Sequence, residues 1–387
     1  MNNSLRTFIS CVLLLAVSVA TLLGQSSHKL DPATFDKNTP ACTDFYQYVN
    51  GGWLVANPIP PAFPSWSLGN ILNERNRDVL RDILEAAAKS TSTTKGSNEQ
   101  KAGDYYASCM DEAKIEADGL KPLAAEIERI AMIKDQKTLQ EEIARLHFIG
   151  INAAFVDGSN QDFKNSAEVT AGVFQGGLGL PERDYYTKTD DKSKTIRDQY
   201  LKPVAKIFEL MSDDPGQAAS EAQSILALET KLVEASMTRV ELRDPQKLYH
   251  RMTMAQLHDL APNFDWLSFF KGIGLTQRTD VNVGTPDFFK TLDQQLSSVS
   301  VADWQTYLRR HLINNTAASL SSSFVDEDFN FNRRILQGAR ENLPRWKRCV
   351  SATNAALGEA VGEVYVKKVF PPAAKTRALE MIRNLRF

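Results

Sequence analysis

Histidine is the side chain best suited to acid–base and metal chemistry near neutral pH. A zinc hydrolase site needs two histidines four residues apart on one helix face, with a glutamate between them as general base. None of the five histidines lies in such an H-E-x-x-H pattern: His28, His147, His250, His258 and His311. His250 and His258 are eight residues apart, about two helical turns, without an acidic residue between them, so we interpret both as surface or hydrogen-bonded helix histidines. We predict no metal ligand and no catalytic residue in this chain.

Other catalytic patterns are also lacking. The sequence has no G-x-S-x-G nucleophile motif and no phosphate-binding loop. The glycines of residues 172–179 do not follow the dinucleotide-binding spacing and belong to a turn, where glycine permits positive φ and Pro181 can start the next helix. We interpret the acidic runs at residues 141–142 and 326–328 as solvated faces and helix starts. A hydrolase that uses carboxylates of this chain stays open as a hypothesis.

The composition places broad limits on the class of protein. The chain has 387 residues, 43% of them hydrophobic, which predicts roughly two globular domains with sizeable cores. Its formal net charge is −2, which argues against broad nucleic-acid binding, because that function favours a basic surface.

The N-terminus has the pattern of an export signal. Arg6 precedes an apolar run over residues 8–23, and the small residues Ser18 and Ala20 fit the −3 and −1 positions of a cleavage site. The run is short for a membrane span. We predict a signal peptide at residues 1–24, with an uncleaved membrane anchor as the alternative, and a polar linker at 25–40. The predicted location is the periplasm, the cell envelope or the extracellular space.

Helical patterns dominate the rest of the chain. Proline-rich residues 57–64 predict an extended, irregular stretch. Apolar residues then recur at three- and four-residue spacing over 68–84, 120–133, 139–149 and 218–237. Thr253 with Gln256 predicts a capping box, and Ser300 with Asp303 predicts the cap of another helix.

Strand signals are few. Residues 151–156 and 169–174 predict a hairpin across 157–168, and Val281–Val283 predicts one further short strand. The fold class that we predict is therefore mainly α, a multi-helix domain with a small β-hairpin.

Four segments, in order, resemble the family of neprilysin and endothelin-converting enzyme. They are Cys42-Thr-Asp-Phe-Tyr-Gln-Tyr-Val-Asn-Gly51; Gly177-Leu-Gly-Leu-Pro-Glu-Arg-Asp-Tyr-Tyr186; Asp244-Pro245 with Tyr249 and Met252-Thr-Met-Ala-Gln256; and Arg345-Trp-Lys-Arg-Cys349 with Ala356-Leu-Gly-Glu-Ala-Val-Gly362. Each motif alone is weakly specific, but four in the expected order are hard to obtain by chance. The resemblance covers residues 40–387.

The resemblance implies roles for the cysteines outside the signal, which contains Cys11. Cys109 and Cys349 match family cysteines that pair with each other, and a bridge closing so long a loop could contribute about 4–5 kcal/mol of stability. Cys42 matches a family cysteine whose partner lies near the far C-terminus, so it is expected to be unpaired here. Asn50 stands where animal relatives carry another cysteine.

The resemblance also assigns one substrate-binding residue. In the family, the helix after the proline-rich stretch borders the substrate cavity and supplies arginines toward the C-terminal side of the peptide. Arg75 matches one of these positions, and Ser67 replaces the other. Arg75 as a plain surface charge near Glu74 and Asp78 is the alternative. For Arg183 and Asp184 the resemblance implies a buried or capping interaction that holds the glycine-rich turn rather than a catalytic role.

The function that the resemblance implies belongs to a larger protein. Residues 41–66 are expected to pack on a catalytic domain, and 67–387 to form the helical lid domain of a zinc metalloendopeptidase that cleaves short peptides on the amino side of hydrophobic residues. The thermolysin-like catalytic domain, with its zinc, is expected to be absent from this chain. The chain alone is then expected to be inactive and to bind no catalytic zinc.

The C-terminal residues predict a helix that has not ended. Ala378, Leu379, Ile382 and Leu385 are spaced like one helix face, and no stop signal follows. Together with the unpartnered Cys42, this pattern favours truncation over a frayed natural terminus. A standalone, non-catalytic helical module that binds a peptide or protein of the envelope is the alternative function.

Overall fold

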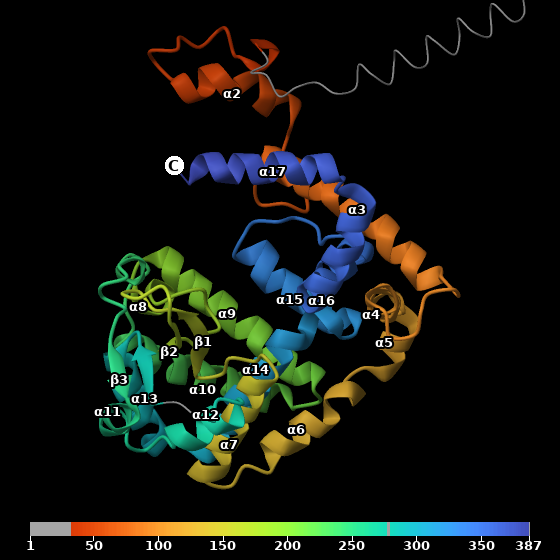
Figure 1. The fold of residues 1–387 in the computed structure, drawn as a ribbon. Coiled ribbons are helices and arrows are strands. Elements are labelled where there is room, and N and C mark those ends of the chain that lie inside the picture. The colour runs from red at the N-terminus through yellow and green to blue at the C-terminus, as the bar shows by residue number, and fades with distance from the viewer. Residues whose placement is uncertain (1–31, 277–278, 387) are drawn as a thin grey trace, which may run out of the picture. The chain divides into compact units, whose positions relative to one another are not determined.

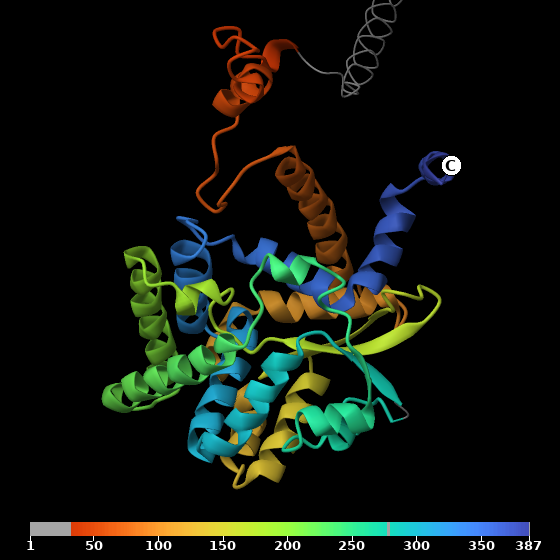
Figure 2. The ribbon, with the colours of Figure 1, turned by 90° about the vertical axis from the view of Figure 1, so that its left-hand side faces the viewer.

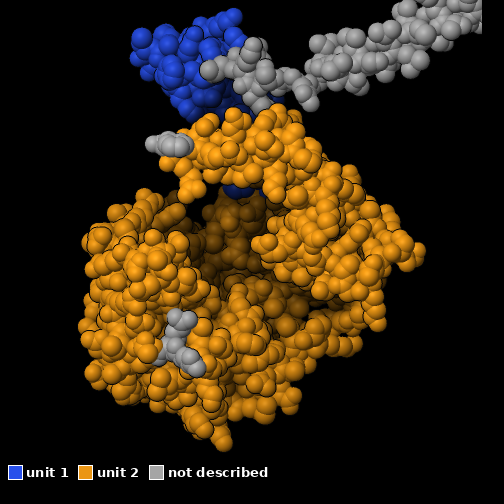
Figure 3. Space-filling model, in the orientation of Figure 1, with its two compact units in different colours: residues 1–72 blue, residues 73–387 orange. Residues whose placement is uncertain are grey.

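The computed structural model describes residues 32–276 and 279–386, which form two compact units, residues 1–72 and 73–387 (Figures 1 and 3). The predicted signal peptide or anchor, Cys11 and His28 lie outside the described residues. Within the described ranges, no helix is both long enough and apolar enough to cross a membrane.

The described part of unit 1 consists of a 3-10 turn, one helix and an extended stretch. The turn η1 (Pro32–Thr34) is followed by α2 (Phe45–Ala56), whose N-cap Asp44 accepts a hydrogen bond from the backbone of Gln47. Residues 57–67 contain no regular helix or strand, as the prolines predict.

Unit 2 is mainly helical, as predicted, and residues 68–72 of unit 1 begin its first helix. The α-helices are α3 (Leu68–Lys89), α4 (Asn98–Met110), α5 (Glu112–Asp118), α6 (Ala124–Ala131), α7 (Gln136–Phe148), α8 (Asp184–Thr187), α9 (Asp191–Leu210), α10 (Pro215–Glu234), α11 (Met254–Leu260), α12 (Trp266–Gly272), α13 (Pro286–Ser298), α14 (Val301–Thr316), α15 (Ser322–Asp328), α16 (Arg345–Val369) and α17 (Pro372–Leu385). Short 3-10 turns are η2 (Lys121–Leu123), η3 (Glu241–Arg243) and η4 (Ala317–Ser319), and η5 (Phe329–Ile335) is a π-helix.

Side-chain caps begin many of these helices and explain their starting points. Ser300 accepts from the backbone N–H of Asp303 at the start of α14, as predicted. Thr253 and Gln256 form the predicted capping box of α11. The pattern over 120–133 was predicted as one helix, but Pro122 lies in η2, and the α-helix begins only at Ala124.

A sheet lies among the helices (Figure 2). It has four strands in the order β1-β2-β4-β3. Its strands are β1 (Phe155–Gln161), β2 (Val169–Gln175), β3 (Arg251–Thr253) and β4 (Asp280–Val283). The pairs β1–β2 and β3–β4 are antiparallel, with Phe155 opposite Gln175 and Met252 opposite Val281, whereas β2 and β4 are parallel. The predicted hairpin and third strand are confirmed, but β1 begins four residues later than predicted, and β3 was not predicted.

Two large apolar clusters hold unit 2 together. One joins the sheet to helices α7 and α10–α14 through aromatic residues such as Phe155, Phe269 and Trp304, which are fully buried or nearly so. The other packs α9 and α10 under the turn that follows β2. A third cluster, between α4 and α16, contains only six buried side chains. Burial of apolar surface is thus unevenly divided within the unit.

Candidate functional site

The glycine-rich segment after β2, residues 176–187, is called the turn region here. It requires glycine at one position because Gly177 has a φ of +72°, and an added Cβ would lie 2.4 Å from the hydroxyl of Tyr307 and 2.7 Å from the carbonyl oxygen of Ala154. At Gly179, an added Cβ would lie 1.8 Å from the hydroxyl of Tyr200. The turn therefore packs its backbone directly against buried side chains.

The buried carboxylate of Glu229, on α10, holds the turn region in place through hydrogen bonds. Its oxygens accept hydrogen bonds from the hydroxyl of Tyr186 at 2.8 Å, the hydroxyl of Tyr200 at 3.0 and 3.1 Å, and the backbone N–H of Gly179 at 3.0 Å. Tyr186 in turn accepts from the N–H of Leu180 at 2.8 Å. The carboxylate thus links the turn to α8, α9 and α10.

Glu229 is completely buried, so its ionised form has lost its hydration. Burial raises its pKa to about 7, while the hydrogen bonds from Tyr186 and Tyr200 and the charge of Arg310 oppose that rise. Burial also raises the pKa of both tyrosine hydroxyls well above the ordinary value, and the nearby Glu229 carboxylate adds to the shift. The network therefore titrates near neutrality through Glu229.

Tyr307 of α14 supports the same turn, and the ring of His311 packs against the ring of Tyr307, with the ring centroids 4.3 Å apart. The hydroxyl of Tyr307 donates to the carbonyl of Gly177 at 2.6 Å and accepts from the N–H of Ala154 at 3.0 Å. His311 is also buried, and burial lowers its pKa to about 3, so it is neutral at physiological pH. Arg310, between the two in sequence, is only 4% exposed.

A cavity of about 1060 Å³, the turn pocket, opens on the turn region. Its walls are the backbone and side chains of residues 175–183 together with Met237, Arg239, Asn332 and Leu336. The latter two lie in or next to the π-helix η5, an arrangement often found at functional sites. The polar groups that line the pocket include the guanidinium groups of Arg183 and Arg239 and the amide of Asn332.

Arg183 and Asp184 do not hold the turn in the expected way. Their side chains are each 31% exposed and form a loose ion pair of 3.8 Å, and Arg183 makes no capping hydrogen bond at the start of α8. Asp184 also pairs with Lys188 at 2.9 Å. The expectation of a buried or capping interaction is wrong, because both side chains are partly exposed to solvent and Arg183 does not cap the helix. Likewise, α8 begins at Asp184 and not at Pro181.

Arg75 lies on α3 and is exposed. The neighbouring Glu74 is engaged by Arg77 at 2.5 Å and by Lys347. Among the described residues, Arg75 has no ion pair, so its guanidinium is available for a ligand. Its substrate-binding role stays a prediction.

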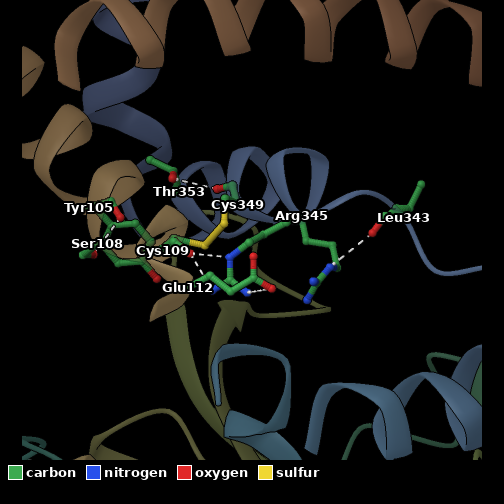
Figure 4. Close-up of a disulfide and its surroundings, with 9 residues drawn as sticks. Tyr105, Ser108, Cys109, Glu112, Leu343, Arg345, Cys349 and Thr353 are labelled. Atoms are coloured by element: carbon green, nitrogen blue, oxygen red, sulfur yellow. Dashed lines mark hydrogen bonds and ion pairs between the residues drawn. A yellow bond between two sulfur atoms is a disulfide. The ribbon is translucent and has the colours of Figure 1, made fainter. Parts of the chain in front are cut away.

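The disulfide between Cys109 and Cys349 joins the end of α4 to the first turn of α16, with a Cα–Cα distance of 5.7 Å (Figure 4). It connects the two cysteines that the resemblance pairs, across 240 residues of sequence. Arg345 donates two hydrogen bonds to the carbonyl of Cys109, at 2.9 and 2.8 Å. Cys42 carries a free, exposed thiol.

The contacts of the described histidines differ from those of metal ligands. His147 is buried and contacts the carboxylate of Asp157 at 2.6 Å and the carbonyl of Ala153 at 2.7 Å. His250 precedes β3, whereas His258 is on α11 and exposed, so the two do not share a helix. In residues 32–276 and 279–386, no group of three or more His, Cys, Asp or Glu is arranged to hold a metal ion.

Sequence reasoning missed Glu229, although a signal was present. Glu229 lies four residues after Ile225 and three before Leu232, within the apolar stripe of α10, where a solvated glutamate is not expected. The burial of Glu142 was missed as well. We interpreted it as solvated, but it is 6% exposed, and burial raises its pKa, whereas Glu141 is exposed as expected.

Comparison with known proteins gives consistent matches along the chain. The sequence profile of Peptidase family M13 matches residues 41–387. Endothelin-converting enzyme 1 of Rattus norvegicus is 31% identical over 368 residues, which is 91% of this chain and 47% of that protein. Neprilysin-3 of Drosophila melanogaster is 29% identical over 374 residues, with 91% and 50% coverage.

Among solved structures, the Mycobacterium tuberculosis zinc metalloprotease Zmp1 in complex with an inhibitor is similar, with a TM-score of 0.86 and 32% identity. The match covers 92% of this chain and 54% of that protein. The chain thus spans about half the length of the curated relatives that it matches.

Proposed function

Because this chain belongs to peptidase family M13, we propose that residues 41–387 form the substrate-covering part of an exported zinc endopeptidase that cleaves short peptides. The observation that carries the proposal is the family match over nearly the whole chain, supported by the likeness of its fold to a zinc metalloprotease. Cleavage on the amino side of hydrophobic residues belongs to the same proposal.

Zinc, which the family implies, does not fit the described residues. Two of the four described histidines, His147 and His311, are buried in the core, and no described group of side chains has the arrangement of a metal site. We therefore assign the metal, its ligands and the general base to a further, catalytic part of the protein, which is the main partner of these residues. This assignment accords with relatives about twice as long.

The role of the described residues in this proposal is to bind the peptide and limit what enters. A wall facing the catalytic centre excludes bulk water and admits only peptides small enough to fit. Figure 3 shows that unit 2 is hollowed on the side facing the viewer, which is consistent with such a wall. We assign Arg75 to the carboxyl end of the peptide, because a free guanidinium binds a carboxylate with two parallel hydrogen bonds.

Reading the gene beyond codon 387 provides the sharpest test. We expect a continuing frame that encodes H-E-x-x-H, whose full product hydrolyses an internally quenched peptide and loses that activity with a zinc chelator. The 387-residue chain alone should show no hydrolysis. A frame that stops at codon 387, together with peptide binding by the chain, would favour the envelope-binding module instead. Zinc-dependent hydrolysis by the 387-residue chain would contradict the division of roles.

The role of Arg75 can be tested in the full-length protein by replacing this arginine with alanine. Arg75→Ala should raise KM about tenfold for a peptide with a free C-terminal carboxylate and leave KM unchanged for the C-terminal amide. The matched control is Arg377→Ala, an exposed arginine on α17. Equal KM changes for acid and amide would remove Arg75 from the binding site.

A further inference from the structure

Arg348, on the first turn of α16, carries a positive charge that forms no ion pair with any described residue. Among the described residues, its side chain makes one hydrogen bond, from Nε to the carbonyl of Leu343 at 3.2 Å, and no carboxylate lies within ion-pair distance. The neighbouring Arg345 differs, because it donates twice to the carbonyl of Cys109 and lies 3.9 Å from Glu112 (Figure 4). The outer nitrogens of Arg348 are therefore left for another partner.

A cavity of about 610 Å³, the α16 cavity, lies beside these two arginines and the disulfide. Arg345 and Arg348 both line it. Five alkyl side chains, called the alkyl wall here, also line it: Ile115 of α5, Ala318, Leu343, Ala352 and Ala355. The other lining residues are the disulfide cysteines, Tyr105 and the serines Ser108, Ser319 and Ser351. The cavity thus combines two cationic side chains with apolar surface and a few hydroxyl groups, which is the usual composition of a small-ligand site.

The electrostatics of the cavity favour an anion. Burial lowers the pKa of Arg348, and the charge of Arg345 lowers it further. The more distant carboxylates of Glu112, Asp326 and Asp328 act in the opposite direction but do not offset these two effects. A half-buried charge beside a like charge is costly, and an anionic ligand would remove that cost.

We propose that the α16 cavity binds the carboxylate of a small ligand that carries an apolar side chain, such as the C-terminal end of an amino acid or peptide. The outer nitrogens of Arg348 receive the carboxylate, and the alkyl wall receives the side chain. A planar guanidinium matches a carboxylate bidentately. A bare inorganic anion would satisfy the charge but leave the alkyl wall uncovered. The site is separate from Arg75 and does not depend on the proposed peptidase function.

The test compares two probes on the 387-residue chain by isothermal titration calorimetry. N-acetyl-L-leucine carries the carboxylate and the apolar side chain, and N-acetyl-L-leucinamide lacks only the charge. We expect the acid to bind at least about tenfold more tightly than the amide, and more weakly as the salt concentration rises. Arg348→Met, which keeps the length and apolar volume of the side chain, should abolish the difference between the probes.

Arg377→Met on α17 is the matched control and should bind both probes like the unchanged protein. Because the acid–amide comparison is made on the unchanged chain, it does not depend on the folding of a variant. Equal binding of acid and amide, absence of binding by both, or an undiminished preference for the acid in a folded Arg348→Met protein would each overturn the proposal. Circular dichroism establishes that the variant is folded.

Discussion

The turn region and the α4–α16 pair, both in unit 2, are stabilised by different kinds of interaction. The turn region is held by hydrogen bonds to one buried carboxylate and packs on a cluster that includes Tyr200, Phe208 and Phe331. The α4–α16 pair is held by the Cys109–Cys349 disulfide beside a cluster of six buried side chains, compared with ten in the cluster under the turn region. Where apolar burial is extensive, a desolvated charge can be tolerated, and where it is limited, a covalent bond supplies the stability. The stability of the α4–α16 pair should therefore depend on the disulfide, and that of the turn region on Glu229 and its protonation.

The largest expected change in stability follows from removal of the Cys109–Cys349 disulfide. Replacing both cysteines, Cys109→Ser with Cys349→Ser, should lower the free energy of unfolding by about 4–5 kcal/mol, because the unfolded chain regains the freedom of a very long loop. Urea denaturation measures the change. Cys42→Ser, which alters an exposed free thiol, is the control and should change stability by less than about 0.5 kcal/mol. An unchanged midpoint in the double variant would show that α4–α16 packing suffices without the bond.

Loss of Glu229, the hydrogen-bond acceptor of the turn region, should lower the free energy of unfolding nearly as much. Glu229→Ala leaves the hydroxyls of Tyr186 and Tyr200 and the N–H of Gly179 without their partner and opens a cavity. We expect a loss of about 4 kcal/mol at pH 5.5 by urea denaturation. Glu234→Ala changes an exposed glutamate at the end of the same helix and should have little effect. Similar stability for the two variants would mean that packing alone holds the turn.

Protonation of Glu229 predicts that the stability of the turn region depends on pH. Its folded-state pKa of about 7 lies above the ordinary value of 4.5, so the folded protein binds the proton more tightly than the unfolded chain. The stability from this group is fully present below pH 4.5 and is lost as pH rises through 7. Between pH 5 and pH 8 the unchanged protein should lose about 2–3 kcal/mol relative to Glu229→Gln. A difference between the two proteins that stays constant with pH would refute the shift.

The smallest of these effects concerns one hydroxyl at the far side of the turn. Tyr307→Phe removes the acceptor of the Ala154 N–H and the donor to the Gly177 carbonyl, both buried. We expect a loss of about 2 kcal/mol in urea denaturation. Tyr105→Phe, on an exposed position of α4, is the control and should be neutral. If both variants unfold alike, water replaces the hydroxyl at the turn.

Much of the fold was predictable because its signals are local. Ser300 and Thr253 cap helices through bonds three residues away, so the sequence contains both partners. Strand β1 was misplaced because its last five residues, Asp157-Gly-Ser-Asn-Gln161, have low strand propensity and form a strand by pairing along β2 at the sheet edge. Strand β3 has only three residues, too few to show alternation.

The candidate site was predicted less completely. The glycine-rich turn and its need for positive φ could be predicted, since few other residues adopt that conformation. The partners of the turn could not, because Glu229 and Tyr307 come from helices 50 and 130 residues away in sequence. The same holds for the α16 cavity, whose wall combines α5 with α16.

Through the family resemblance, the sequence indicated which cysteines pair. By itself it determined the family, the mainly helical class and the turn that needs glycine. These depend on residue identity and on short-range spacing, which the chain carries in any conformation. Only the tertiary structure decided that β2 runs parallel to β4, that Glu229 is buried at the turn and that Arg348 faces a cavity without a carboxylate partner. Burial and charge pairing depend on which distant segments meet, and local sequence does not encode that choice.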